Sequence, residues 1–147
     1  MASFQDVRGF FEAQAMADLK AAGIPDNLIF FDNVGETPGQ ANQSYAVVSL
    51  SFTDTVEDTV SCEGIEDLRG SIQVNCYTPK NKGSKAGEDI CLQVMKGWQA
   101  INKLRPLPTE TILQACLRSI EGPLSINGGD RPHAAYTIAA TWIARAA

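Results

Sequence analysis

Lysines and glycines crowd a short segment between an expected strand and an expected helix, where nucleotide-binding proteins often hold phosphate. The segment spans residues 79–87, and its lysines are Lys80, Lys82 and Lys85. A phosphate-binding loop has the pattern G-x-x-x-x-G-K-[ST], whose backbone N–H groups wrap the phosphates while its lysine reaches the outer ones. Here three residues separate Gly83 from Gly87, and the next residue is Glu88, whose carboxylate would repel phosphate. We therefore expect no nucleotide site, and we interpret the lysines as a solvated tip or as contacts to a partner protein.

The second candidate for chemistry is the single histidine, His133, which follows Asp130 and Arg131 in a segment expected to join two strands. A lone histidine in a loop is expected at the surface rather than as a general base. A Cys–His pair stays open, because spatial neighbours need not be sequence neighbours. The sequence has no G-x-S-x-G or H-E-x-x-H motif, so it predicts no catalytic residues and no enzyme.

The four cysteines fit no common metal or redox motif, because none forms C-x-x-C and their gaps match no zinc spacing. Cys76, Cys91 and Cys116 fall within apolar patterns and are expected to be small buried hydrophobes of a reduced protein. Cys62 lies in a polar segment and is the candidate for an exposed thiol. We expect neither a cofactor nor a metal.

Residues 53–69 follow neither the helix period nor the strand period. Their six acidic residues, against the single base Arg69, are Asp54, Glu57, Asp58, Glu63, Glu66 and Asp67. The segment lacks the alternating oxygen ligands and the glycine of a calcium loop. We expect a long loop that is mobile in the free subunit and becomes ordered against another protein, so that deleting Thr55 to Gly64 would leave the melting temperature nearly unchanged. With the three lysines, these acidic residues form the predicted protein interface.

The bulk properties limit the class of protein. A chain of 147 residues, 44% of them apolar, is enough for a single domain spanning residues 1–147. The net charge of −5 and the pI near 4.8 argue against an electropositive nucleic-acid surface. No apolar run approaches a membrane span of about 20 residues, and the N-terminal segment lacks the features of a secretory signal. We expect folding in a cytoplasm.

Hydrophobic periodicity predicts two helices and five strands. Phe4, Val7, Phe11, Ala15, Leu19 and Ala22 form one helical stripe, which starts after a possible Ser3 cap and ends at Gly23. A second helix after Ser84 is stopped by the prolines of residues 105–108. Strands are expected at 28–33, 45–52, 70–77, 111–121 and 134–145. The order predicts an α+β fold, a mostly antiparallel sheet with both helices on one face, whose other face meets water or a partner.

The layout of nearly the whole chain resembles the tail terminator proteins of long-tailed bacteriophages. Four parts carry the resemblance: a strand "YAVVSLSF" followed by a polar loop, the strand "RGSIQVNCYTPKNKG" entering a Pro/Gly loop, the helix directly after it, and the C-terminal pair of strands containing "EGPLSINGGDRPHAAYTIAATWIARA". The segment "TDTVEDTVSCEGIED" matches nothing specific in that family.

The resemblance implies a structural virion protein that forms a hexameric ring on the finished tail tube. Such a ring halts polymerisation of the tube and provides the surface that joins the head. Its partners would be other copies of this chain, the tail tube protein and the head–tail connector or neck protein, while DNA passes through the lumen without specific binding and no membrane takes part. It would lie at the head-proximal end of the tail in the virion, after assembly in the bacterial cytoplasm. The alternatives are a head–neck joining protein, another minor tail protein, or a small cytosolic enzyme with a site built from scattered polar residues.

Overall fold

The computed structural model describes residues 4–31, 43–57, 66–79, 84–103, 112–126 and 133–146. Within these ranges the chain forms helix α1 (Phe4–Ala21), the short 3-10 helix η1 (Asp26–Leu28), strands β1 (Ile29–Phe31), β2 (Tyr45–Glu57) and β3 (Glu66–Pro79), helix α2 (Lys85–Lys103), and strands β4 (Ile112–Ile126) and β5 (His133–Ala146). This is the predicted order of elements, and it confirms the α+β class.

The five strands of the described residues form one sheet in the order β1-β2-β3-β5-β4. β1 and β2 run parallel, and the three other neighbouring pairs are antiparallel. The longest unbroken register joins β3 to β5, from the pair Glu66–Ala146 to the pair Pro79–His133. The sheet is therefore mostly antiparallel, as predicted.

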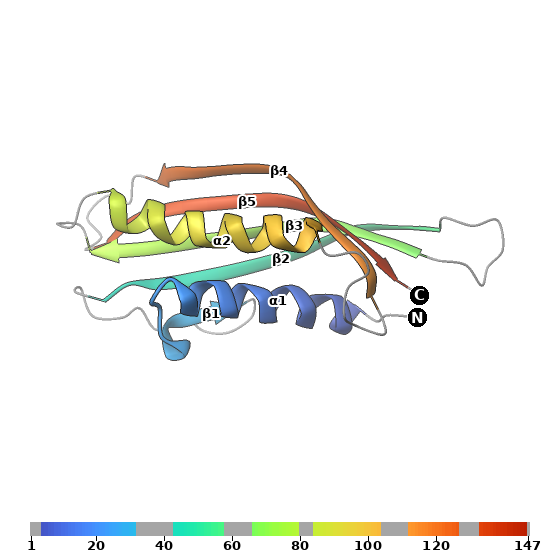
Figure 1. The fold of residues 1–147 in the computed structure, drawn as a ribbon, viewed down its shortest axis with the longest axis horizontal. Coiled ribbons are helices and arrows are strands. Elements are labelled where there is room, and N and C mark those ends of the chain that lie inside the picture. Colours follow the sequence, from blue (N-terminus) through green and yellow to red (C-terminus); the bar gives the residue numbers. More distant parts are fainter. Residues whose placement is uncertain are drawn as a thin grey trace.

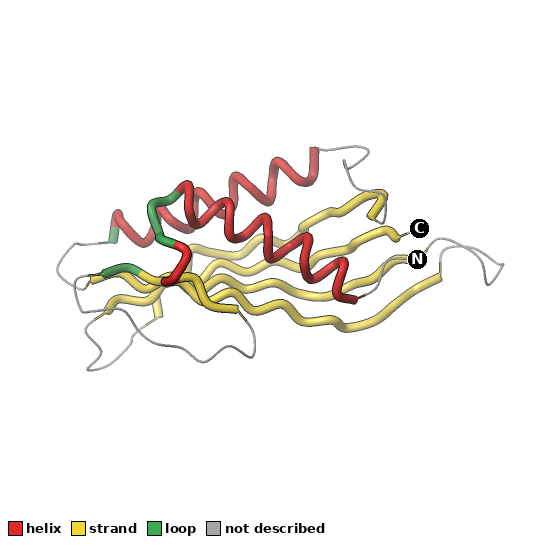
Figure 2. Tube along the Cα trace, turned by 90° about the horizontal axis from the view of Figure 1, so that it is seen from below, coloured by secondary structure: helices red, strands yellow, loops and turns green. Residues whose placement is uncertain are grey.

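Both α-helices lie on the same face of the sheet, with their axes roughly along the strands (Figures 1 and 2). Alternation along the strands creates the face that they cover: Val48 and Leu50 of β2, Ile72 and Val74 of β3, and Ile138 of β5 are buried. Trp142 of β5 lies at the centre of this layer. Its ring centroid is 5.0 Å from that of Phe11 and 5.3 Å from that of Phe52, so one indole links α1 to two strands.

Gly23 terminates helix α1 by adopting a left-handed backbone conformation. Gly23 has a φ of +97°, which a residue with a side chain rarely adopts. The Gly23 N–H bonds the Lys20 carbonyl and the Ile24 N–H bonds the Leu19 carbonyl, each at 3.0 Å, which is the Schellman arrangement. The predicted stripe is buried from Val7 to Leu19, but Phe4 is 59% exposed and contacts the Phe52 ring edge-on from the end of the helix. The expected cap, Ser3, lies outside the described residues.

The prediction of a loop over residues 53–69 was wrong at both of its ends. β2 continues to Glu57 and β3 begins at Glu66, and the two strands stay paired there, with Thr55 opposite Leu68 and Glu57 opposite Glu66. Leu68 is only 3% exposed and belongs to the core. Only residues 58–65 lie outside the described part of this hairpin. The C-terminal pair also extends past its predicted end, because β4 continues to Ile126.

Candidate interaction surface

The face of the sheet that carries no helix is the largest candidate surface in the structure (Figure 2). The sheet register aligns its side chains in rows across the strands, such as Ser51 on β2, Ser71 on β3 and Thr141 on β5. These three side chains are exposed, small and uncharged. We call this surface the open face. It offers hydrogen-bonding groups with little desolvation cost, which suits contact with another protein.

One hydrogen bond between β5 and β3 and one within β3 hold the centre of the open face in place. Asn75 Oδ1 accepts a bond of 2.7 Å from the Thr137 hydroxyl and one of 3.0 Å from the Gln73 amide. These bonds fix the three side chains relative to one another before any partner arrives. The entropic cost of ordering them on binding is correspondingly reduced.

An aromatic cluster closes one end of the open face. The rings of Tyr45 and Tyr77 stack with centroids 4.5 Å apart and planes within 9°, and the His133 ring meets Tyr45 edge-on at 5.1 Å. His133 Nε2 lies 2.8 Å from the Gln43 carbonyl oxygen, which only accepts, so Nε2 carries the proton. His133 is 4% exposed, and the expectation of a surface histidine was wrong. The histidine is held as a structural donor between two distant segments.

The predicted acidic interface residues fall on the β2–β3 hairpin. In the backbone register Asp54 lies opposite Arg69, Val56 opposite Asp67, and Glu57 opposite Glu66. The hairpin thus brings residues from both ends of the acidic segment together. Asp58 and Glu63 lie outside the described residues, as do Lys80 and Lys82.

Lys85, the remaining predicted interface residue, begins α2 at the opposite end of the molecule's long axis from the hairpin (Figure 1). Its ammonium lies 3.1 Å from the Asp89 carboxylate one turn later. Its side chain is 89% exposed, so this pair contributes little to stability. The structure therefore places Lys85 and the acidic hairpin at opposite ends of the molecule and not in one site.

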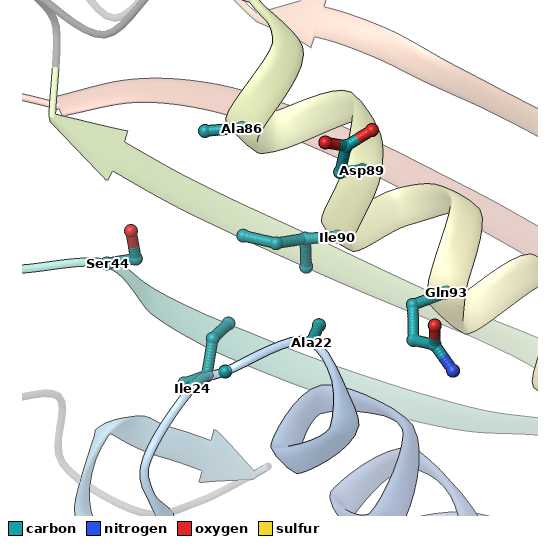
Figure 3. Close-up of a pocket in the computed structure, with 8 residues that line it drawn as sticks. Ala22, Ile24, Ser44, Ala86, Asp89, Ile90 and Gln93 are labelled. Carbon is teal, nitrogen blue, oxygen red and sulfur yellow. The ribbon is translucent and has the colours of Figure 1, made fainter.

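A half-open pocket of about 360 Å³ lies where α1 ends beside the first turns of α2 (Figure 3). Its polar side chains are Ser44, Asp89 and Gln93, and its remaining lining residues are Ala22, Gly23, Ile24, Ala86 and Ile90. Asp89 is engaged by Lys85, and the lining contains no cysteine or histidine. The pocket therefore has no nucleophile paired with a base.

One buried carboxyl group escaped the sequence-based prediction. Asp18 of α1 is 6% exposed and lies against Gly97 of α2, where a Cβ would come within 2.1 Å of Asp18 Oδ2. Asp18 Oδ1 accepts a hydrogen bond of 3.0 Å from Gln14, whereas Oδ2 has no partner. Burial raises the pKa of Asp18 to about 6, against the opposing effect of the Gln14 bond. The only signal in the sequence was the position of Asp18, which lies three residues after Ala15 and four before Ala22 and so shares a helix face with the predicted stripe.

The cysteines of the described residues are free, and the prediction of buried packing holds for two of them. Cys76 of β3 and Cys91 of α2 are fully buried, while Cys116 of β4 is partly exposed. The hydrogen bond between the Cys76 and Cys91 thiols, together with burial, holds the pKa of Cys76 well above its ordinary value. Cys76 therefore stays protonated, unlike a reactive thiolate. Cys62 lies outside the described residues.

The described part of the chain contains neither a metal-binding cluster nor a membrane-spanning helix. No group of three or more histidine, cysteine, aspartate or glutamate side chains there is placed to hold a metal ion. No helix there is long and apolar enough to cross a membrane.

Comparison with known proteins finds the same fold in a solved structure but does not indicate a function. No family model matches the chain, and no curated protein matches it. Among solved structures 22 chains match. One of them, whose name states no activity, covers 97% of this chain and 96% of its own with a TM-score of 0.60 and 20% sequence identity. At this identity the similarity shows that the two chains share a fold over nearly their whole length.

Proposed function

We propose that this chain is a structural subunit of a long-tailed bacteriophage, a tail terminator that caps the tail tube as a ring. The ring stops polymerisation of the tube and presents the surface to which the head is joined. Its subunits are copies of this chain, and its other partners are the tail tube protein and the neck. The resemblance in the layout of strands and helices supports this assignment.

The observation that carries the proposal is the open face. Two helices cover one side of the sheet, and the other side presents exposed polar side chains in rows, such as Ser51, Ser71 and Thr141, whose row continues to the exposed Arg118 on β4. In a monomeric enzyme we would expect polar groups to converge on a pocket. Here the polar groups are instead spread across a broad surface, as in a subunit that contacts other proteins.

The shape of the subunit supports the same role. The acidic β2–β3 hairpin and the start of α2 lie at opposite ends of its long axis (Figure 1). A ring closes by head-to-tail contacts, so each subunit must carry two different complementary surfaces. Its two rims must also differ, because one meets the tube and the other the neck. A subunit with dissimilar ends suits that requirement.

The decisive experiment is to add the purified chain to polymerising tail tubes. We expect six-fold rings at tube ends by electron microscopy, tubes that stop growing, and a ring-sized species by mass photometry. A chain that remains monomeric and leaves tube growth unchanged would refute the role. Rings that bind an isolated neck but no tube would favour the head–neck alternative.

A matched pair of variants tests the open face itself. Ser71→Arg places a charge at its centre, and Gln99→Arg places the same charge on an exposed position of α2. We expect S71R to lower the yield of capped tubes and Q99R to leave it unchanged. Equal yields would show that the open face is not an assembly surface.

A further inference from the structure

A sheet with free edges can add a strand from another copy, so what covers the two edges of this sheet decides whether copies can pair there. β4 is the last strand on one side. On the other side β1 covers β2 only from Ala46 to Val48, which leaves β2 as the edge strand from Ser49 onward among the described residues. Uncovered backbone N–H and C=O groups on such strands are templates for pairing between chains.

The β4 edge is capped by one side chain of α2. Asn102 Nδ2 donates to the Leu117 carbonyl oxygen at 2.9 Å, and the Leu117 N–H donates to Asn102 Oδ1 at 2.6 Å. In an antiparallel pair the N–H and C=O of one residue point to the same side. Both groups of Leu117 therefore point away from β5, and the Asn102 amide satisfies them as a neighbouring strand would.

The β2 edge is capped from α1. Arg8 Nη2 donates to the Leu50 carbonyl oxygen at 3.2 Å. The same guanidinium lies over the Phe52 ring at 5.5 Å and pairs with Glu12 at 3.4 Å. One side chain thus occupies the Leu50 carbonyl oxygen and lies over the Phe52 ring, on the stretch of edge that follows β1.

Each cap lies in a stretch of edge whose register is regular. The β4–β5 register is regular from Gln114 to Arg118 and shifts twice after that. The β2–β3 register is regular up to Phe52, shifts there, and is regular again from Asp54 to Glu57. Bulges and shifts already discourage pairing. Leu117 lies within the regular stretch from Gln114 to Arg118, and Leu50 lies within the regular stretch before Phe52, where no shift in register discourages pairing.

The two edges also match each other in direction. β2, β3, β5 and β4 alternate in direction across the sheet, because each neighbouring pair is antiparallel. β4 of one copy placed beside β2 of the next would continue that alternation. Such head-to-tail pairing joins two different edges, so it is heterologous and can repeat without limit.

We propose that Asn102 and Arg8 are autoinhibitory caps that keep the sheet edges of this chain from pairing with a second copy. Asn102 satisfies both outward backbone groups of Leu117 at the β4 edge, and Arg8 occupies the Leu50 carbonyl oxygen at the β2 edge, so each edge carries a cap in one of its regular stretches. The caps act in the free chain, so the inference does not depend on a role in tail assembly.

The test compares the double variant Arg8→Ala, Asn102→Ala with the double variant Gln5→Ala, Lys103→Ala. Gln5 and Lys103 are exposed on the same two helices. Sedimentation over a range of concentrations should show self-association that is at least about tenfold stronger in the cap variant, the scale of one lost hydrogen-bonded contact. The control should sediment as the unaltered chain does. A cap variant that is folded and sediments like its control would overturn the proposal.

The position of the new contact is checked by cross-linking. Ser51→Cys on β2 and the native Cys116 on β4 serve as the two probe thiols, in a Cys62→Ser background. We expect a short bismaleimide to link S51C of one copy to Cys116 of another only when the caps are removed. Equal cross-linking with and without the caps would refute the inference.

Asn102→Asp separates capping from simple destabilisation. The aspartate keeps an acceptor for the Leu117 N–H and places a charge at the edge, which opposes strand addition. We expect N102D to remain unassociated while N102A associates. Association of both to the same degree would show that loss of stability, rather than loss of the cap, drives pairing. Each single variant retains one cap, which provides a folded comparison if the double variant does not fold.

Discussion

Asp18→Asn should stabilise the protein at neutral and alkaline pH. The substitution keeps the size of the side chain and the Oδ1 atom that accepts from Gln14, and it removes the charge that burial disfavours. The pKa of Asp18 rises from 3.8 to about 6 on folding, and each pKa unit corresponds to about 1.4 kcal/mol. The buried carboxylate therefore costs about 3 kcal/mol above pH 6. The amide of the variant leaves an unpartnered N–H₂ at the position of Oδ2, which returns about 1–2 kcal/mol of that gain.

The pH dependence isolates the charge from this second effect. Between the unfolded pKa and the folded pKa, the native state binds the proton that the unfolded state has released, so stability falls as pH rises through that window. The amide of the D18N variant does not titrate, so the cost of its unpartnered N–H₂ is the same at every pH. The free-energy difference between variant and parent should thus be about 2 kcal/mol larger at pH 8 than at pH 4.

Chemical denaturation of both proteins at the two pH values measures this difference. Asp26→Asn is the control, since Asp26 is exposed and forms a surface pair with Lys20 at 3.2 Å. Such pairs contribute at most about 1 kcal/mol. A D18N variant whose stability difference does not change with pH would show that the Asp18 carboxylate is solvated in the folded protein, and the reasoning from burial would fail.

Two further predictions follow from close contacts and from register. Gly70→Ala should destabilise the protein by roughly 1–3 kcal/mol in thermal or chemical unfolding, because a Cβ there would lie 1.9 Å from the Ser51 carbonyl oxygen and 2.6 Å from the Trp142 ring. Gly9→Ala, whose added Cβ would have nothing within 4 Å, should instead stabilise α1 by about 0.5–1 kcal/mol. Equal effects of the two substitutions would contradict the argument from close contacts. Deleting Thr55 to Gly64 should lower the melting temperature, since it removes the strand residues paired with Glu66, Asp67 and Leu68; replacing only residues 59–64 with a short turn removes none of these pairs and should change it by far less, and identical melting temperatures would show that the hairpin extension contributes nothing.

Sequence periodicity predicted the elements that bury one side and leave the other in water. α1 shows the helical period clearly, and the central stretches of β2, β3 and β5 show the strand period clearly, because their inner residues meet a common core. The hairpin extension escaped this test, because its apolar residues are too few and too widely spaced to show the strand period. The six carboxylates give that segment the composition of a solvated loop, although backbone pairing holds both of its ends in the sheet. The charge content of the segment therefore led to a wrong prediction of its backbone conformation, because cross-strand hydrogen bonds join backbone groups whatever charges the side chains carry.

The groups that the sequence could not place all depend on contacts between distant residues. His133 is buried because the backbone of Gln43, far away in the chain, accepts its hydrogen bond. Asp18 is tolerated in a buried stripe because a glycine, Gly97, lies opposite it on the other helix. Asn102 resembles an ordinary polar residue near a helix end, and its role appears only when Leu117 is beside it. No local pattern carries these pairings, because each is set by the packing of separate elements.

The caps, the helices and the open face together limit how copies of this chain can meet. α1 and α2 cover one side of the sheet, and Arg8 and Asn102 each cap one regular stretch of an edge. Contacts between folded subunits then favour the open face, the outer surfaces of the helices and the two ends of the long axis. Side-chain contacts of this kind form and dissolve without rearranging the sheet. If such contacts are individually weak, a template that holds several copies together, such as a tube end, would favour the ring of the proposed function, because their combined effect rises with the local concentration.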